Sequence, residues 1–140
     1  MGHQATSTRG ERTAELDSAP SSVTAARHLV RDDLRTRGLP SRVIEDALVV
    51  VTELVGNAVR HARPLRGTDR SGVVILRWDA TDSQVRIHVT DGGGRKQPHV
   101  EPPSFADTGG RGLAIVSAIA SDWGVASDSD RVTVFAVVSA

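Results

Sequence analysis

Cysteine and tyrosine are absent from this chain, and the other large aromatic residues number only two Phe and two Trp. Without cysteine the protein has no disulfide bond, no thiolate metal site and no thiol nucleophile. Because aromatic side chains are so few, Val, Leu, Ile and Ala must build the hydrophobic core. No stretch of the sequence approaches the roughly 20 apolar residues that a membrane-spanning helix needs.

An excess of either charge is also missing, since 17 Lys and Arg residues balance 17 Asp and Glu residues. The chain therefore lacks the overall positive charge that would favour direct binding to nucleic acid. The polar residues 1–10 lack the apolar core of a signal peptide, so we expect a cytoplasmic protein that does not contact a membrane. The 140 residues suit one domain. We predict a disordered arm over residues 1–10 and a single domain over residues 11–140.

Hydrophobic periodicity and turn-forming residues predict three helices and five strands. We expect the helices over residues 23–38, 41–62 and 113–122, with Ser21 and Ser22 capping the first of them. We expect the strands over residues 12–17, 73–80, 84–91, 123–127 and 131–138. Two initial helices followed by antiparallel strands, with one helix among them, indicate an α+β two-layer sandwich.

The second predicted helix carries three polar residues spaced four apart, namely Glu53, Asn57 and His61. This spacing places them in one stripe on the helix surface. An Asn side chain offers a neutral oxygen to Mg²⁺, which prefers oxygen ligands and usually keeps waters and phosphate oxygens. A Glu one turn away could orient or deprotonate a hydroxyl or water that attacks phosphorus. The same spacing is also typical of the solvated face of an amphipathic helix.

A second candidate segment, from Asp91 to Gly94, follows directly after a predicted strand. An aspartate at a strand end can accept a hydrogen bond from an exocyclic amine such as that of adenine. The glycines beside it let the backbone approach a flat base. The alternative is an ordinary turn of Asp and Gly residues. The prolines that follow prevent the regular helix that a dinucleotide-binding motif needs at this point.

The third candidate segment runs from Gly109 to Gly112 and opens the third predicted helix, with Arg111 among its glycines. Backbone N–H groups exposed at a helix start bind anions. An arginine there can add a charge-assisted hydrogen bond to phosphate. No Gly-Lys-Ser or Gly-Lys-Thr follows, which excludes a Walker P-loop. A flexible entry to a helix would have the same composition.

Taken in order, the three segments resemble the N, G1 and G2 boxes of the GHKL ATPases, a superfamily with the Bergerat (histidine-kinase-like) fold. The resemblance covers residues 11–138 and rests on ELVGNAVRHA at 53–62, DGGG at 91–94 and GGRGLAIV at 109–116. It is strongest to one branch, the stand-alone ATP-binding proteins related to anti-sigma factor serine/threonine kinases. It implies a mixed, mostly antiparallel sheet covered by about three helices.

The resemblance implies a role for each polar residue of the N box. Asn57 would be the metal ligand and would coordinate the Mg²⁺ that bridges the ATP phosphates. Glu53 would be the catalytic base or the carboxylate that orients a water. His61 would lie at the edge of the nucleotide pocket.

The two glycine-rich boxes would complete the nucleotide site. Asp91 would bind the adenine amine, and Gly93 would pack close to the base. Gly110, Arg111 and Gly112 would cover the phosphates at the start of the third helix. The segment between the two boxes would be a lid that stays mobile until the nucleotide arrives.

Two positions depart from the family pattern. Arg95 stands where the usual Asp-x-Gly-x-Gly motif has its second glycine, a change that bears on affinity for adenine. Asp130 and Arg131 occupy the region where many relatives carry Gly-Lys before the last strand, a change that bears on phosphoryl transfer.

For function, the resemblance implies one of two classes of protein. The first is a Mg-ATP-binding anti-sigma factor and serine/threonine kinase of a partner-switching system, which phosphorylates an anti-anti-sigma (STAS-type) protein. The second is a non-catalytic ATP-binding regulator that binds a sigma factor or STAS partner. The presence of both Glu53 and Asn57 favours the kinase. The resemblance also implies a homodimer, formed through residues near Arg12 to Leu34.

Overall fold

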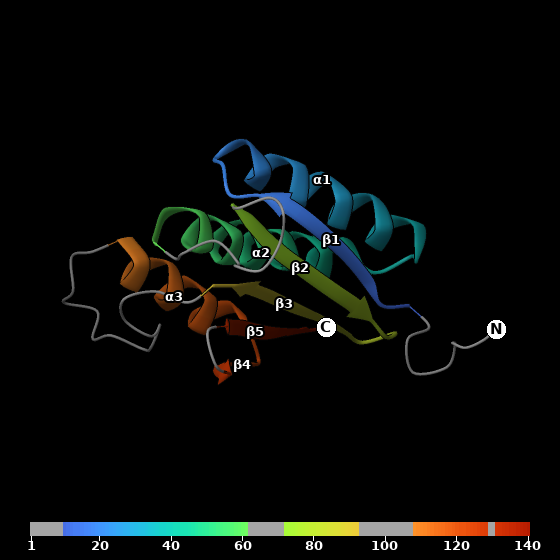
Figure 1. Ribbon diagram of the computed structural model, residues 1–140. Helices are drawn as coiled ribbons and strands as arrows, with labels where there is room; N and C mark the ends of the chain where they lie inside the picture. The colour runs from blue at the N-terminus through green and yellow to red at the C-terminus, as the bar shows by residue number, and fades with distance from the viewer. Residues whose placement is uncertain (1–9, 62–71, 93–107, 129–130) are drawn as a thin grey trace.

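The computed structural model describes residues 10–61, 72–92, 108–128 and 131–140 of the chain. Within these ranges, three helices cover one face of a five-stranded sheet (Figure 1). In chain order the elements are β1 (Arg12–Asp17), α1 (Ser21–Thr36), α2 (Ser41–His61), β2 (Val73–Ala80), β3 (Gln84–Asp91), α3 (Thr108–Ile119), β4 (Asp122–Asp128) and β5 (Arg131–Ser139). The predicted α+β two-layer sandwich is therefore confirmed.

The sheet has the strand order β1-β2-β3-β5-β4. Each neighbouring pair of these described strands is antiparallel, which meets the expectation of a mostly antiparallel sheet. β5 lies between β3 and β4, although it follows both of them in the chain. In the connection between β2 and β3, the Thr81 hydroxyl accepts hydrogen bonds from the backbone N–H groups of Ser83 and Gln84.

α1 packs through a stripe of buried residues spaced four apart: Ser22, Ala26, Val30 and Leu34. The helix ends at Thr36, and Gly38 beyond it has a φ of +80°, which suits a residue without a Cβ. There the backbone N–H groups of Leu39 and Gly38 bond to the carbonyls of Leu34 and Arg35, at 3.3 and 3.0 Å. These two bonds satisfy carbonyl groups that the helix end would otherwise leave unpaired.

The prediction that serines cap α1 was wrong. Pro20 is the N-cap residue, and no side chain there bonds to the helix backbone. Because the φ and ψ of Pro20 are already helical, at −56° and −33°, the helix starts earlier and takes Ser21 and Ser22 into its first turn.

α2 is the central helix of the layer, because it contacts both other helices and the strands β2, β3 and β5. Its apolar face is buried. The residues of that face include Val43, Ala47, Val50, Val51, Leu54, Val55 and Ala58.

α3 begins and ends earlier than predicted. The segment from Gly109 to Gly112 forms its first turn rather than a separate entry. The backbone N–H of Ser121 bonds to the carbonyl of Val137 at 2.8 Å, so pairing with β5 ends the helical path and places Asp122 in β4.

The two faces of the sheet differ in what covers them. Alternate residues of β3 and β5 are buried beneath the helices: Val85, Ile87 and Val89, and Val134, Ala136 and Val138. The residues between them point to the opposite face, where no described helix lies. This second face is called the uncovered face below.

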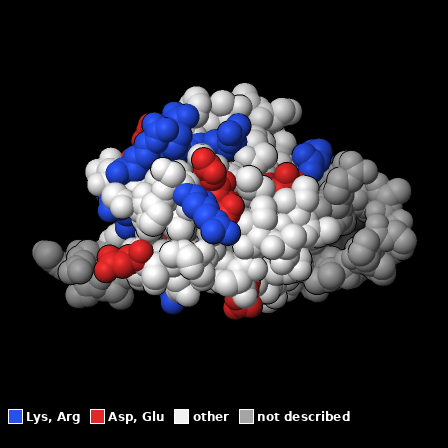
Figure 2. Space-filling model, turned by 180° about the vertical axis from the view of Figure 1, so that it is seen from behind, with Lys and Arg blue, Asp and Glu red and all other residues white. Residues whose placement is uncertain are grey.

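Oppositely charged side chains lie next to one another on the side of the molecule shown in Figure 2. Two ion pairs along α1 show the same mixing, Arg31–Asp32 at 3.5 Å and Arg37–Asp33 at 2.7 Å. No described helix is both long and apolar enough to cross a membrane.

Candidate functional site

The described parts of the three predicted segments come together at one end of the fold. The C-terminal end of α2, the C-terminal end of β3 and the N-terminal end of α3 all lie at the left of Figure 1. α2 packs against both α3 and β3, which holds these ends in a fixed arrangement. Segments that are widely separated in the sequence therefore share one region of the structure.

Asn57 and Glu53 lie one turn apart in α2, and both side chains are half-buried. The amide oxygen Oδ1 of Asn57 is buried and has no hydrogen-bond partner among the described residues. Buried polar atoms in folded proteins almost always have a partner, so such an atom calls for a physical explanation. An amide oxygen that receives no hydrogen bond from these residues can coordinate a cation or accept a hydrogen bond from a ligand.

Asp91 is the last residue of β3 and is only 4% exposed. It is the second residue after Val89, so it points to the helix-covered face of the sheet, as Val89 does. The sheet therefore presents this carboxyl group on the side where α2 and α3 lie. Its strand partner is Val132 of β5.

Gly110, Arg111 and Gly112 lie in the first turn of α3. The first four N–H groups of a helix have no partner inside the helix. Together with the helix dipole, these groups make the start of α3 suitable for an anion such as phosphate.

Part of the predicted site lies outside the described residues. Gly93 is one such residue, as are Arg95 and most of the predicted lid. His61 ends α2, as expected from its spacing, although its side chain is outside the description.

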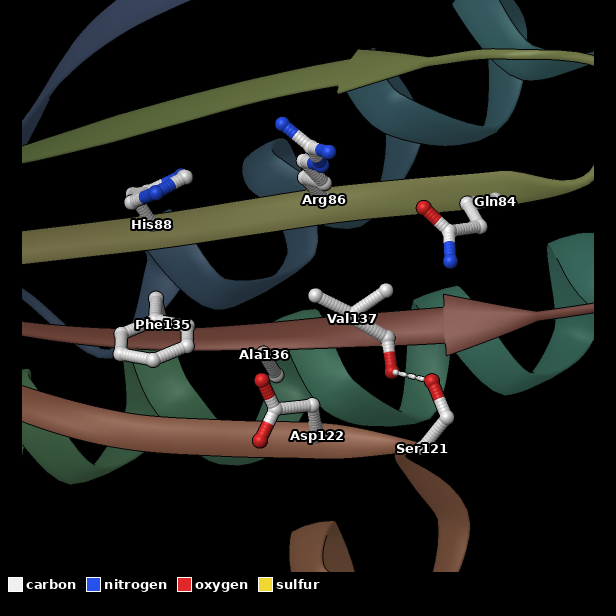
Figure 3. Close-up of a pocket in the computed structure, with 8 residues that line it drawn as sticks. All are labelled: Gln84, Arg86, His88, Ser121, Asp122, Phe135, Ala136 and Val137. Carbon is white, nitrogen blue, oxygen red and sulfur yellow. Dashed lines mark hydrogen bonds between the residues drawn. The ribbon is translucent and has the colours of Figure 1, made fainter.

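Two features of this region were missed by sequence reasoning. Val132 lies opposite Asp91 because β5 is inserted between β3 and β4, an order that no local pattern reveals. A hollow of about 400 Å³ lies on the uncovered face, where β5 runs between β3 and β4 (Figure 3). It is lined by Gln84, Arg86, His88, Ser121, Asp122, Phe135, Ala136 and Val137. Since the predicted segments gather on the helix-covered side, this hollow is not the predicted nucleotide site.

His88 in this hollow has a lowered pKa, first because of burial and second because of the nearby Arg77 guanidinium. Its ring stacks on Phe135, with a centroid separation of 6.1 Å. Both residues belong to the uncovered face. The lowered pKa of His88 is therefore a property of that face and not of the predicted nucleotide site.

A model of the histidine kinase-like ATPase domain family matches residues 16–137 of the chain. Among solved structures, the chain is similar to the RsbU and RsbW domains of Rv1364c from Mycobacterium tuberculosis, with a TM-score of 0.68 and 22% sequence identity. This match covers 92% of the chain but 32% of that structure's chain, so the protein spans about a third of its length. At this level of identity the likeness concerns the fold.

A second similar structure is the histidine kinase AdeS from Acinetobacter baumannii, with a TM-score of 0.46 and 15% identity. This match covers 91% of the chain and 67% of the AdeS chain. No curated protein matches the sequence.

The family match spans α2, β3 and α3, the elements that bring the candidate residues together. The observed order of helices and antiparallel strands is consistent with the fold of that family. Membership of an ATPase-domain family implies nucleotide binding. The chain belongs to the histidine kinase-like ATPase domain family, within the GHKL superfamily of ATPases.

Proposed function

We propose that the protein binds Mg-ATP where α2, β3 and α3 meet, and acts as an anti-sigma factor and serine/threonine kinase. The observation that carries this proposal is the buried Oδ1 of Asn57, which has no hydrogen-bond partner in the part of the chain that the structure describes. An unpaired buried polar group costs roughly 1–3 kcal/mol. Contact with a ligand would remove this cost. The substrate would be an anti-anti-sigma protein of the STAS type, as the sequence resemblance implies.

The donor set of this chain suits a magnesium ion that is held largely by the nucleotide. Asn57 provides one neutral oxygen. Among the described residues no group of three or more His, Asp and Glu side chains could hold a metal ion. Mg²⁺ commonly uses one or two protein ligands and completes its shell with phosphate oxygens and water. When bound, the ion would offset the negative charge of the phosphates.

The remaining site residues would position the nucleotide and the substrate. Asp91 would accept a hydrogen bond from the adenine amine, with Gly93 against the base and His61 at the edge of the pocket. The first turn of α3, with Gly110, Arg111 and Gly112, would bind phosphate through its backbone N–H groups.

Glu53 would act as the base of the transfer step. It would accept the hydroxyl proton of the substrate serine while the serine oxygen bonds to the γ-phosphorus. The bond from the γ-phosphorus to the bridging oxygen would break, and ADP would leave. The transferred phosphate would add about −1.5 to −2 charges to the partner and so change its binding surface.

The second candidate is a regulator that binds ATP without transferring phosphate. The departures from the family pattern at Arg95 and at Asp130 and Arg131 favour this alternative. A cytoplasmic location and a homodimer through residues near Arg12 to Leu34 remain predictions under either function.

Calorimetric titration with ATP, with and without Mg²⁺, tests the nucleotide site. We expect saturable binding that Mg²⁺ strengthens, and at least tenfold weaker binding for Asn57→Leu in the presence of Mg²⁺. Leu has a similar volume but no oxygen. Tight, Mg²⁺-dependent binding by the folded Asn57→Leu variant would contradict the assigned metal ligand.

Phosphoryl transfer to a purified STAS-type protein separates the two candidate functions. We expect Glu53→Gln to bind Mg-ATP nearly as well as the wild type but to lose at least 99% of the transfer rate, about 100-fold. Glu45→Gln is the matched control, because Glu45 is an exposed carboxylate on the same helix. Binding without transfer in the wild type would favour the non-catalytic regulator.

A further inference from the structure

The hollow on the uncovered face is crossed by a row of side chains with opposite charges at its two ends. Strand register places Arg86 of β3, Val137 of β5 and Asp122 of β4 side by side across the sheet. Two strand spacings, roughly 9–10 Å, separate the backbones of the two charged residues. Both are exposed, and neither makes an ion pair within the described ranges. The hollow therefore offers a cation at one edge and a carboxylate at the other, with space between them.

The floor between the two charges is apolar. Val137 and Phe135 are neighbours along β5 on this face, and both are half-buried. Figure 3 shows Val137 between Arg86 and Asp122, with Phe135 beside it along the strand. Such a floor favours the hydrocarbon part of a ligand, because contact removes apolar surface from water.

Gly124 of β4 determines where the ring of Phe135 lies. The two residues are partners in the strand register. A Cβ at Gly124 would stand 2.8 Å from two ring atoms of Phe135, so a larger residue here would displace the ring. A glycine inside a strand often marks such a close approach. The ring therefore leans across β4, on the side of the hollow that carries Asp122.

His88, the second ring of the hollow, adds little positive charge near neutral pH. Burial, followed by the Arg77 guanidinium, lowers the pKa of His88 below its ordinary value of 6.5. A neutral imidazole does not repel a bound cation. Among the described residues that line the hollow, Arg86 then carries the positive charge and Asp122 the negative charge.

We propose that the hollow binds a small zwitterionic molecule with a guanidinium group at one end and a carboxylate at the other, as in free arginine. The guanidinium bonds to the Asp122 carboxylate and stacks on the ring of Phe135, because a flat cation suits both partners. The ligand carboxylate forms a charge-assisted bond with Arg86. The aliphatic chain between them crosses Val137.

The size and direction of the hollow favour a single small molecule. Its volume of about 400 Å³ is near the lower end of small-molecule pockets, which span about 300–1,000 Å³. The two charges lie in one row, so the ligand runs across the strands. A peptide that extended the sheet would instead run along the edge of β4. This binding site goes beyond the proposed kinase function and lies on the opposite side of the sheet from the nucleotide site.

Nuclear magnetic resonance titration of the full chain with L-arginine tests the proposal and locates the bound ligand. We expect saturable shifts of backbone amides around Arg86, Phe135 and Asp122, and none along α1. Two matched probes each lack one charged group of arginine. Citrulline has a neutral urea in place of the guanidinium, and agmatine has no carboxylate. Each should bind roughly fivefold more weakly than arginine, the effect of one exposed ion pair.

Two variants connect each charge of the ligand to its partner in the protein. We expect Asp122→Asn to bind arginine and citrulline equally, and Arg86→Gln to bind arginine and agmatine equally, because each variant has already lost the contact that the probe lacks. Asp128→Asn is the matched control, since Asp128 is an exposed carboxylate on the same strand that does not line the hollow. All three positions are exposed, and thermal unfolding checks that the variants fold as the wild type does.

Four outcomes would overturn the proposal. Arginine could cause no saturable shifts, the shifts could lie away from the hollow, either probe could bind as tightly as arginine, or either variant could still discriminate against its probe as the wild type does. A titration repeated with ATP present should give the same shifts. Displacement of arginine by ATP would place it in the nucleotide site and would also overturn the proposal, whereas a failure of ATP to bind would leave the arginine result unchanged.

Discussion

Asp33 on α1 and Asn57 on α2 each carry a polar group into the protein interior, but their surroundings differ. The Asp33 carboxylate accepts hydrogen bonds from Trp78 Nε1 at 2.9 Å, Arg37 Nε at 2.7 Å and Arg12 Nε at 3.3 Å. The Asn57 amide oxygen accepts no hydrogen bond from any residue that the structure describes. The first group ties α1 to the strands β1 and β2, so its position serves the fold. The unpaired Asn57 oxygen lowers the stability of the fold when no ligand is bound. Such a loss of stability is expected of a residue that serves ligand binding.

The contrast also separates a misleading motif from an informative one. The segment from Asp33 to Thr36 looks like the phosphoacceptor region of sensor histidine kinases, but Asp32 stands where those proteins have their histidine. The structure gives Asp33 a structural role, since its partners come from three different elements. The N-box segment around Asn57 has a polar atom that the described part of the fold leaves unsatisfied.

The largest effect should come from removing the carboxylate of the satisfied site. Asp33→Ala leaves the Trp78 indole and two arginines without their shared acceptor, and should destabilise the protein by about 2–3 kcal/mol. Urea unfolding measures the change. Asp32→Ala is the control, because the Asp32 side chain is 71% exposed and should contribute less than about 0.5 kcal/mol. Equal effects at the two positions would contradict the role of Asp33.

A smaller effect is expected when only one donor of this site is removed. Trp78→Phe keeps an aromatic ring beneath α1 but loses the indole N–H, while the two arginines still bond to Asp33. We expect a loss of about 1–2 kcal/mol. A double-mutant cycle with Asp33→Ala should show coupling of at least 0.5 kcal/mol by order of magnitude, since the two side chains share one hydrogen bond. Additive effects would mean that the bond contributes little.

The opposite sign is expected at the unsatisfied site. Asn57→Leu removes a buried amide oxygen that has no partner within the described ranges, so the free energy of unfolding should stay unchanged or rise by up to about 1 kcal/mol. The unfolding must be measured without nucleotide, because ATP would stabilise only a protein that binds it. A loss of 2 kcal/mol or more, by the same order-of-magnitude scale, would show that Asn57 serves the fold as Asp33 does.

The smallest effect concerns pH and the uncovered face. Burial and the Arg77 guanidinium lower the pKa of His88 below about 6.5, so the unfolded chain binds a proton at a higher pH than the folded protein does. Stability should therefore fall as pH drops through 6.5. His88→Gln lacks this proton site, and its melting temperature should decline less between pH 7.5 and 5.5. Parallel curves for the two proteins would contradict the lowered pKa.

Much of the candidate site could be predicted because each of its segments has a local signature. The spacing of Glu53, Asn57 and His61 places them on one stripe of a helix, and a helix of this length is visible in the periodicity of its apolar residues. Asp91 ends an alternating strand, so its position at a strand end was also local information. The cap of α1 was missed because Pro20 competes with the serines for the start of the helix.

The sequence by itself determined which residues point inward, because burial follows the period of a helix or a strand and that period is written in neighbouring residues. It also determined the family, through motif residues that stand in one order along the chain. Only the tertiary structure decided which residues meet. The bond between Trp78 and Asp33, the pairing of Asp91 with Val132 and the row that joins Arg86 to Asp122 all depend on strand order and register. These are set by packing between segments distant in the chain, for which a local pattern carries no information.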